Sequence, residues 1–209
     1  MGRQRRMRSI SQADISTVPL ARAFYERDTV RVARELLGTI LVRTNGHTVL
    51  RGVIVETEAY RGEGDPASHA YRGPTKRNAV MFGPAGHAYV YFTYGMHYCL
   101  NVTTEPTGNP GAVLIRAAQP TSGIEQMKKR RRTDQLRDLA NGPAKLTQAF
   151  AVSRSLNGHD LTLGKKLFIV KGDSVEPLDI ASTSRIGIRV GLEKPWRFFI
   201  RENPFVSKQ

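Results

Sequence analysis

The run Val53-Ile54-Val55-Glu56-Thr57-Glu58-Ala59-Tyr60 joins an apolar β-strand to two carboxylates and an aromatic ring. Upstream of it, Asn45-Gly46 is a strong hairpin signal and predicts that a strand over 39–43 precedes this one. Side chains alternate between the two faces of a strand, so Glu56 and Glu58 fall on one face and Thr57 on the other. We therefore expect a hairpin whose second strand carries two acids to one side.

The remaining elements are expected to follow in a mixed order. Helices are predicted over 20–26, 28–37, 122–132 and 143–151, the second capped by Asp28 and ended by Gly38. Strands are predicted over 87–94, 98–104, 112–117, 166–170, 185–190 and 196–201. Residues 61–86 are rich in Gly, Pro and charge, which predicts a long surface loop. This order predicts an α+β fold.

Composition narrows the class of protein. The 209 residues suit one domain, expected over 19–209 behind a flexible basic arm at 1–18. Cys99 is the only cysteine, which argues against a disulfide framework and favours a reducing compartment such as the cytoplasm. No apolar stretch approaches the ~20 residues of a membrane helix, so no membrane association is expected. The net charge of +14 favours a polyanionic partner.

Glu58 is the first candidate for chemistry. A carboxylate at the end of a buried strand can orient and deprotonate a water, as hydrolysis of an N-glycosidic bond requires. A rim glutamate paired with an arginine would look the same in the sequence. Glu56 competes for the role, and two acids on one face also permit a two-carboxylate glycosidase. Their close spacing favours one of the two pointing deeper, in a structural ion pair.

A second cluster, Tyr89-Val90-Tyr91-Phe92-Thr93-Tyr94-Gly95, supplies flat rings. Tyr89 and Tyr91 share a strand face, and Tyr91 with Tyr60 could sandwich a planar base, which is worth roughly 1–3 kcal/mol per base. Tyr94 precedes a predicted hairpin tip and could enter a duplex as a wedge. Tyrosines are also ordinary strand residues, so one of them could belong to the core.

Three polar residues are further candidates. His69 lies in the long loop and could donate to a base or to the backbone, although a lone loop histidine is more often without a role. Asn101, inside an apolar strand, could hold a pocket wall, read a base edge or satisfy the backbone. Arg116 ends a strand and could hold a water near Glu58 or form a surface ion pair. His87 and His97 flank the tyrosine run, but no carboxylate falls at a ligand-like spacing from them, so no metal site is expected.

Basic residues suit contacts with phosphates. Lys76 and Arg77 lie in the long loop, and Lys145 follows Gly142-Pro143 at a predicted helix start, which is a favourable position for a phosphate. The basic run at 128–132 is more typical of a solvated helix end. We therefore expect the first three to contact phosphates.

In this order, these pieces resemble the alkyladenine (3-methyladenine) DNA glycosylase family, as a bacterial-type member, over roughly residues 19–207. The stretches that carry the resemblance are Phe24-Tyr25, Leu36-Leu37-Gly38, Val55-Glu56-Thr57-Glu58-Ala59-Tyr60, Asp65-Pro66-Ala67-Ser68-His69-Ala70, Thr75-Lys76-Arg77-Asn78, Met81-Phe82, Tyr89-Val90-Tyr91, Tyr94-Gly95-Met96, Cys99-Leu100-Asn101, Leu114-Ile115-Arg116-Ala117, Gly142-Pro143-Ala144-Lys145-Leu146 and Pro204 to Ser207. Each stretch alone is weak, but so many in a fixed order are specific.

The resemblance implies a base-excision repair enzyme that flips alkylated or deaminated purines out of double-stranded DNA. It implies hydrolysis of the N-glycosidic bond by an activated water, with no cofactor, by a monomer in the cytoplasm near the nucleoid. The implied fold is a single compact domain with a curved, mainly antiparallel sheet flanked by helices. No lysine falls in the matched pocket set, which favours a monofunctional glycosylase over a lyase.

The resemblance also implies roles for single residues. Glu58 corresponds to the general base, and Arg116 to its partner in holding the water. Tyr60, His69 and Tyr91 correspond to the stacking walls of the base pocket. Asn101 corresponds to the floor residue that disfavours the exocyclic amine of guanine, and Tyr94 to the intercalating wedge.

Two other classes fit part of the sequence. A nucleic-acid-binding protein without catalysis would explain the charge and the rings but would leave Glu58 without a role. A carbohydrate-active hydrolase that uses Glu56 and Glu58 would leave the basic surplus unexplained.

Overall fold

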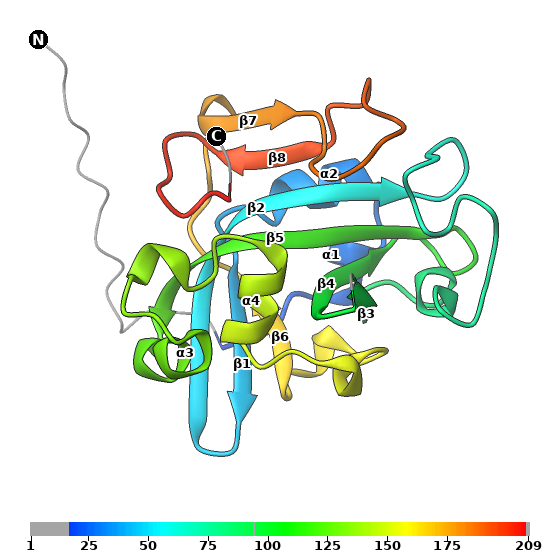
Figure 1. The fold of residues 1–209 in the computed structure, drawn as a ribbon. Helices are drawn as coiled ribbons and strands as arrows, with labels where there is room; N and C mark the ends of the chain where they lie inside the picture. The colour runs from blue at the N-terminus through cyan, green and yellow to red at the C-terminus, as the bar shows by residue number, and fades with distance from the viewer. Residues whose placement is uncertain (1–16, 94, 208–209) are drawn as a thin grey trace, which may run out of the picture.

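The computed structural model describes residues 17–93 and 95–207, which form an eight-stranded antiparallel sheet with helices packed on it (Figure 1). The strand order is β3-β4-β5-β2-β1-β6, with β8 paired to β2 and β7 paired to β8. The strands are β1 (Ile40–Asn45), β2 (Thr48–Arg61), β3 (Ala88–Thr93), β4 (His97–Thr104), β5 (Gly111–Ser122), β6 (Leu167–Val170), β7 (Ile180–Thr183) and β8 (Arg197–Ile200). The α+β prediction is confirmed.

Within the described ranges, four short α-helices and five 3₁₀ helices connect or cover these strands. The α-helices are α1 (Arg22–Tyr25), α2 (Thr29–Glu35), α3 (Ile124–Arg131) and α4 (Pro143–Ala149). The 3₁₀ helices are η1 (Ala79–Phe82), η2 (Leu136–Asp138), η3 (Arg154–Leu156), η4 (Leu161–Leu163) and η5 (Pro177–Asp179). Asp28 caps α2 as predicted, since its side chain accepts a hydrogen bond from the Arg31 backbone N–H.

Strand β2 is the element to which most of the sheet is attached. Its first half pairs with β1, its second half with β8, and most of its length with β5. The register with β5 shifts between Ile54 and Glu56 and again between Glu56 and Thr57. Such bulges bend a strand, and Figure 1 shows β2 turning between its hairpin end and its far end. The expected curvature therefore arises beside the two acids.

The main hydrophobic core lies on the Thr57 side of β2. The Thr57 hydroxyl donates to the backbone carbonyl of Ala33 in α2 at 2.7 Å, and α2 buries Val32 and Ala33 there. Leu146 and Phe150, from and just after α4, belong to the same cluster. Because Thr57 faces this core, the neighbouring Glu56 and Glu58 face the opposite side of the strand.

The predicted strand over 185–190 is wrong: these residues form an irregular loop, and the paired segment is β7 at Ile180–Thr183. The alternation of Ile186, Ile188 and Val190 imitates a strand, but a loop side chain can follow the same spacing. The predicted basic arm at 1–18 lies outside the described residues up to residue 16. No helix in the described ranges is long and apolar enough to cross a membrane.

Candidate active site

A row of side chains crosses four adjacent strands on one face of the sheet. In the strand register, Tyr89 of β3 pairs with Asn101 of β4, Asn101 with Leu114 of β5, and Leu114 with Glu58 of β2. Neighbouring strands lie about 4.8 Å apart, so β3 and β2 are separated by roughly 14 Å, with β4 and β5 as the floor between them. The sheet itself therefore leaves a space between the tyrosines of β3 and the end of β2.

A cavity of about 230 Å³ occupies this space. Its volume is below the ~300–1,000 Å³ of pockets for drug-sized ligands, and suits one planar base. Five of the predicted site residues line it, with contributions from β2, β3, β4, β5 and two loops. The lining residues are Tyr60, Ala67, His69, Met81, Tyr89, Tyr91, Thr93, Cys99, Asn101, Ala112, Leu114, Arg116, Pro143, Ile186, Gly187 and Ile188.

Glu58 lies directly behind this lining and is fully buried. Its Oε2 accepts a hydrogen bond from the Tyr60 hydroxyl at 2.8 Å. Its Oε1 accepts one from the Ile186 backbone N–H at 2.7 Å and lies 3.3 Å from Arg116 Nη1. All three partners line the cavity, so the carboxylate is separated from the cavity by groups that it binds directly.

Glu56, two residues away on the same face, shares Arg116 with Glu58 but otherwise has different partners. Its Oε1 accepts hydrogen bonds from Arg116 Nε at 2.9 Å and from Arg197 Nε at 2.7 Å. The Ser207 backbone N–H donates to its Oε2 at 2.7 Å. Glu56 is fully buried among these groups and is not part of the cavity lining. Glu56 is therefore the acid that forms the structural ion pair expected for one of the two, and a two-carboxylate site is not formed.

Aromatic rings form the walls. Tyr91 and His69 meet edge to face, with ring centroids 4.6 Å apart, and Tyr89 lies 5.3 Å from Tyr91. His69 Nδ1 and the Tyr89 hydroxyl are hydrogen-bonded at 2.9 Å, which fixes the imidazole at the cavity. Tyr60 lines the same cavity from β2. Tyr89 is the tyrosine of the predicted cluster that is almost completely buried, at 1% exposure.

Asn101 lies at the floor of the cavity, and burial shifts the pKa values of several residues that line it. Asn101 is 3% exposed and donates to the Tyr89 backbone carbonyl at 3.1 Å, so one side of its amide is held by the backbone. Burial raises the pKa of Tyr60 and Tyr91 well above the usual range and that of Tyr89 to about 12, so the three phenols are neutral. Burial opposes the charge on Arg116, but the adjacent carboxylates of Glu58 and Glu56 hold its pKa above its usual range.

His69 is held neutral at its position. Partial desolvation, and then the positive charge of Arg77, lower the pKa of its imidazole below the ordinary value. The Arg77 guanidinium lies 5.2 Å from the centroid of the Tyr91 ring, so this predicted phosphate contact stands next to the cavity. Both Arg77 and Lys76 are exposed.

Lys145, a predicted phosphate contact, is not among the described residues that line the cavity. It lies in the first turn of α4, whose Pro143 lines the cavity, and its Nζ is bound to Asp138 at 3.1 Å and to Asn141 at 2.7 Å. Tyr94, the predicted wedge, lies outside the described residues. Its described neighbours form the β3–β4 hairpin, in which Met96 is 71% exposed.

The residues that sequence reasoning missed come mainly from the loop between β7 and β8. Ile186, Gly187 and Ile188 line the cavity, and the Ile186 N–H is a ligand of Glu58. Their sequence carried only the strand-like alternation described above, which points to no role in a site. No group of three or more His, Cys, Asp or Glu side chains that could hold a metal ion is found among residues 17–93 and 95–207.

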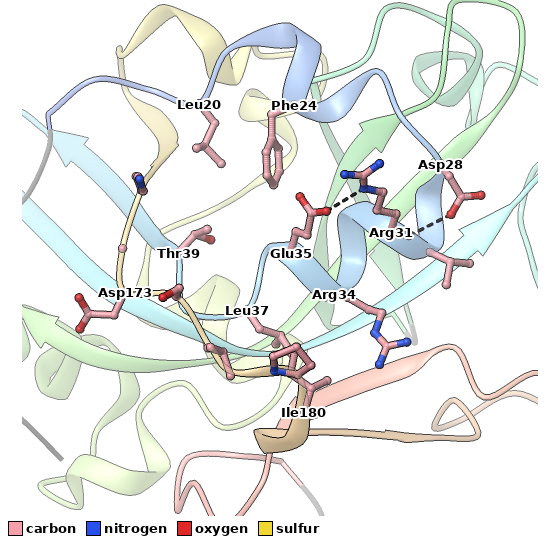
Figure 2. A pocket seen from close by; sticks show the side chains of 16 residues that line it. Leu20, Phe24, Asp28, Arg31, Arg34, Glu35, Leu37, Thr39, Asp173 and Ile180 are labelled. Carbon is pink, nitrogen blue, oxygen red and sulfur yellow. Dashed lines mark hydrogen bonds and ion pairs between the residues drawn. The ribbon is translucent and has the colours of Figure 1, made fainter. Parts of the chain in front are cut away.

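A larger hollow of about 770 Å³ lies beside α2 (Figure 2). Leu20 and Phe24 face it, and the Arg31 guanidinium on its rim is bonded to Glu35 at 2.8 Å. None of the predicted site residues lines this hollow, and its size alone is no sign of chemistry. The smaller cavity holds the convergent polar groups that a reaction needs.

The cavity is walled by flat rings, and a buried carboxylate lies behind it, bound by an arginine and a backbone N–H of the lining. In a chain with a net charge of +14, this arrangement indicates a hydrolase that acts on nucleic-acid bases. The family model for methylpurine-DNA glycosylase matches residues 23–204. The chain therefore belongs to the methylpurine-DNA glycosylase family, DNA-repair enzymes that hydrolyse N-glycosyl bonds, and the resemblance found in the sequence is confirmed.

Individual relatives agree with this assignment. The chain is 57% identical over 191 residues to a protein of Carboxydothermus hydrogenoformans, covering 91% of this chain and 99% of that one. It is 48% identical over 192 residues to a protein of Methanoculleus marisnigri, covering 91% and 99%, and 46% identical over 192 residues to one of Koribacter versatilis, covering 90% and 93%. All three carry the name "Putative 3-methyladenine DNA glycosylase".

Proposed function

We propose that this chain flips alkylated purines out of double-stranded DNA into the 230 Å³ cavity and hydrolyses their N-glycosidic bond with a water that Glu58 activates. The observation that carries the proposal is that Tyr60, Arg116 and Ile186 bind the Glu58 carboxylate and line the cavity at the same time. A base seated between the rings would bring its sugar to this carboxylate.

The step balances as a simple hydrolysis. As the bond between the purine nitrogen and the sugar breaks, its electron pair leaves with the base, and the sugar gains oxocarbenium character. The water oxygen bonds to the anomeric carbon, and Glu58 takes the water's proton. For this, the Tyr60 hydroxyl yields Oε2 to the water while Arg116 remains beside Oε1. A cationic alkylated purine leaves as a neutral base, so it needs no proton from the enzyme.

Selectivity and substrate range belong to the same proposal. His69, Tyr91 and Tyr60 stack on the base, and Asn101 at the floor disfavours the exocyclic amine of guanine. Damaged bases stack and pair poorly, which lowers the cost of flipping them. We include deaminated purines such as hypoxanthine as a second substrate class, because hypoxanthine keeps the flat ring and lacks the exocyclic amine of guanine. Hypoxanthine is neutral in the nucleoside, so it leaves as an anion that takes its proton from water.

The enzyme is proposed to be a monofunctional monomer that works on DNA in the cytoplasm. A lyase needs an amine nucleophile at the sugar, and no lysine occurs among the described residues that line the cavity. Borohydride should therefore trap no covalent enzyme–DNA adduct. Light scattering during gel filtration should give the mass of one chain, 23.3 kDa, and a dimer mass would contradict the monomer.

The substitution Glu58→Gln tests the function directly. The amide keeps the size of the side chain but cannot take a proton, so release of methylated purines from methylated duplex DNA should fall about 10²–10⁴-fold. Released bases are measured by chromatography, and parallel duplexes carry hypoxanthine or ethenoadenine. Binding to a duplex with an abasic-site analogue should persist.

The matched control is Glu63→Gln, because Glu63 is exposed in the loop after β2. This variant should release bases at the wild-type rate. Unchanged release by Glu58→Gln would overturn the assignment of the general base. Wild-type protein that binds damaged duplex but releases no base would instead favour a binding protein without catalysis.

A further inference from the structure

A buried ion pair lies directly behind the cavity wall. The Arg185 guanidinium donates to both carboxylate oxygens of Asp65, with Nη1–Oδ2 and Nη2–Oδ1 distances of 2.7 Å each. Arg185 Nη1 also donates to the backbone carbonyl of Ala59 at 2.9 Å. Both charged side chains are 0% exposed, so neither meets solvent. The two residues come from the loop after β2 and the loop between β7 and β8.

This pair touches three cavity-forming segments that no strand pairing joins directly. The Arg185 guanidinium lies 4.6 Å from the centroid of the Tyr60 ring. The next residue, Ile186, donates its N–H to Glu58 and begins the stretch 186–188 that lines the cavity. Asp65 accepts from the Arg61 N–H at 3.1 Å and so begins the loop that carries His69.

Stability alone is a poor explanation for such a pair. Desolvation of two buried charges can cancel their attraction, and an apolar pair of similar volume is often as stable. Arg185 Nε is also buried and has no hydrogen-bond partner among the described residues, which adds a cost. What a planar, two-pronged contact provides is fixed geometry, because a guanidinium and a carboxylate match in one orientation.

We propose that the Asp65–Arg185 pair is a positioning clamp that holds the Tyr60 ring and the Ile186 N–H in their places on Glu58. This inference rests on the proposed function, since it assigns the clamp to the reaction of that site. Neither residue touches the base. The clamp fixes the distance between the general base and the stacked purine, and a displacement of about 1 Å at a reacting group can lower a rate about 100-fold.

Arg185→Lys is the main test, because lysine keeps the charge but cannot contact both carboxylate oxygens and the Ala59 carbonyl in the same way. Single-turnover release of methylated purines, expressed per folded molecule, should fall about 10–100-fold. The dissociation constant for a duplex with an abasic-site analogue should stay within about twofold, because the cavity is empty in that complex. Arg201→Lys is the matched control, since Arg201 is exposed and its Nε binds only the Leu178 carbonyl in the described structure.

A double-variant cycle separates a clamp from two independent residues. If Asp65 and Arg185 act as one unit, Asp65→Asn combined with Arg185→Lys should lower the release rate no further than either change alone. Losses that multiply would overturn the clamp. So would a variant that melts at a lower temperature but releases bases at the wild-type rate per folded molecule, since that is a purely structural role.

Gly191→Ala is a second variant, for use if Arg185→Lys does not fold. A methyl group at Gly191 would lie 3.1 Å from Arg185 Nη2, so the guanidinium would shift by a few tenths of an ångström without losing its charge, and the alanine would also strain the backbone at its φ of +69°. It should lower the release rate in the same direction, and a wild-type rate would overturn the proposal.

Wild type and Glu58→Gln are measured alongside. An inactive wild type, or an active Glu58→Gln, would contradict the proposed function itself. An active wild type with an inactive Glu58→Gln and a fully active Arg185→Lys would contradict the clamp alone.

Discussion

Glu56 and Glu58 illustrate how two identical side chains on one strand face acquire different roles. Glu56 is enclosed by Arg116, Arg197 and the Ser207 backbone, whereas Glu58 is bound by groups that also line the cavity. A carboxylate fixed between two arginines has little freedom to exchange a proton with a water. Burial is complete for both, so the partners and not the exposure distinguish the two acids.

The first residue-scale prediction concerns Glu56→Gln. It leaves Arg116 and Arg197 without their shared counter-charge in a buried place, so the free energy of unfolding should fall by roughly 3–5 kcal/mol. Urea denaturation followed by circular dichroism measures this. Glu176→Gln, on an exposed side chain, should change it by less than about 0.5 kcal/mol. A loss below about 1 kcal/mol for Glu56→Gln would mean that the ion pair is not structural.

The second concerns His69, whose pKa is lowered by desolvation and then by Arg77. Arg77→Gln removes the charge, so the NMR titration midpoint of His69 should move upward, toward the ordinary value of about 6.5. Arg72→Gln, in the same loop, is the control. Because the folded protein binds this proton less readily than the unfolded chain, the His69 contribution destabilises the fold as the pH falls below about 6.5. Identical midpoints in wild type and Arg77→Gln would exclude the electrostatic effect of Arg77.

At the scale of elements, β2 and the β3–β4 hairpin divide the site between them. Strand β2 carries Glu58 and Tyr60, and β3 carries Tyr89 and Tyr91. Strands β4 and β5 lie between the two. The hairpin extends beyond the cavity, with Phe92 47% and Met96 71% exposed on either side of residue 94. Exposed apolar groups at a hairpin end suit contact with stacked base pairs.

The element-scale prediction is that Tyr94→Ser weakens binding to a lesion-containing duplex by about tenfold or more, since a stacked ring is worth roughly 1–3 kcal/mol. Fluorescence anisotropy measures the affinity. Tyr94→Trp keeps a ring and should restore most of the affinity, and Tyr71→Ser, at an exposed tyrosine outside the hairpin, should leave it unchanged. Equal affinities of Tyr94→Ser and wild type would remove the wedge from the proposal.

On the scale of the whole molecule, the net charge of +14 is the dominant property. Arg77 stands beside Tyr91 of the cavity, the exposed Lys76 precedes it in the loop, and Lys145 lies on α4, whose Pro143 lines the cavity. A chain that neutralises phosphates releases counterions, so its affinity for DNA should fall steeply as salt rises. None of the described residues lines both the cavity and the hollow beside α2, which offers a comparison within one molecule.

Lys76→Gln should make the slope of log affinity against log salt less negative by about 1, and Lys145→Gln by less, because Lys145 must first leave Asp138. Lys171→Gln, on the rim of the hollow beside α2, keeps the same change in net charge and should leave the slope unaltered. Equal slopes for all three variants would mean that net charge, and not the cavity face, governs DNA binding.

Local patterns in the chain were sufficient for most elements and for the family. The hairpin at Asn45-Gly46, the Asp28 cap and the shared face of Glu56 and Glu58 depend on neighbours only a few residues apart, and the structure has all three. Such features are readable because turn chemistry and strand alternation act over short distances. The motifs that resemble the glycosylase family are recognised from residue types in order along the chain, so no distance in the folded protein is needed to find them.

The folded arrangement supplied what those patterns lack. The strand order places Tyr60 of β2 opposite Tyr91 of β3, with β4 and β5 between them. The β7–β8 loop brings the Ile186 N–H to Glu58, which is 128 positions earlier in the chain. Arg197 and Ser207, which are distant in the sequence, bind the Glu56 carboxylate and give it a structural role. Contacts of this kind depend on how the whole chain packs, and the alternation at 185–190 is the same for a paired strand and a cavity-lining loop.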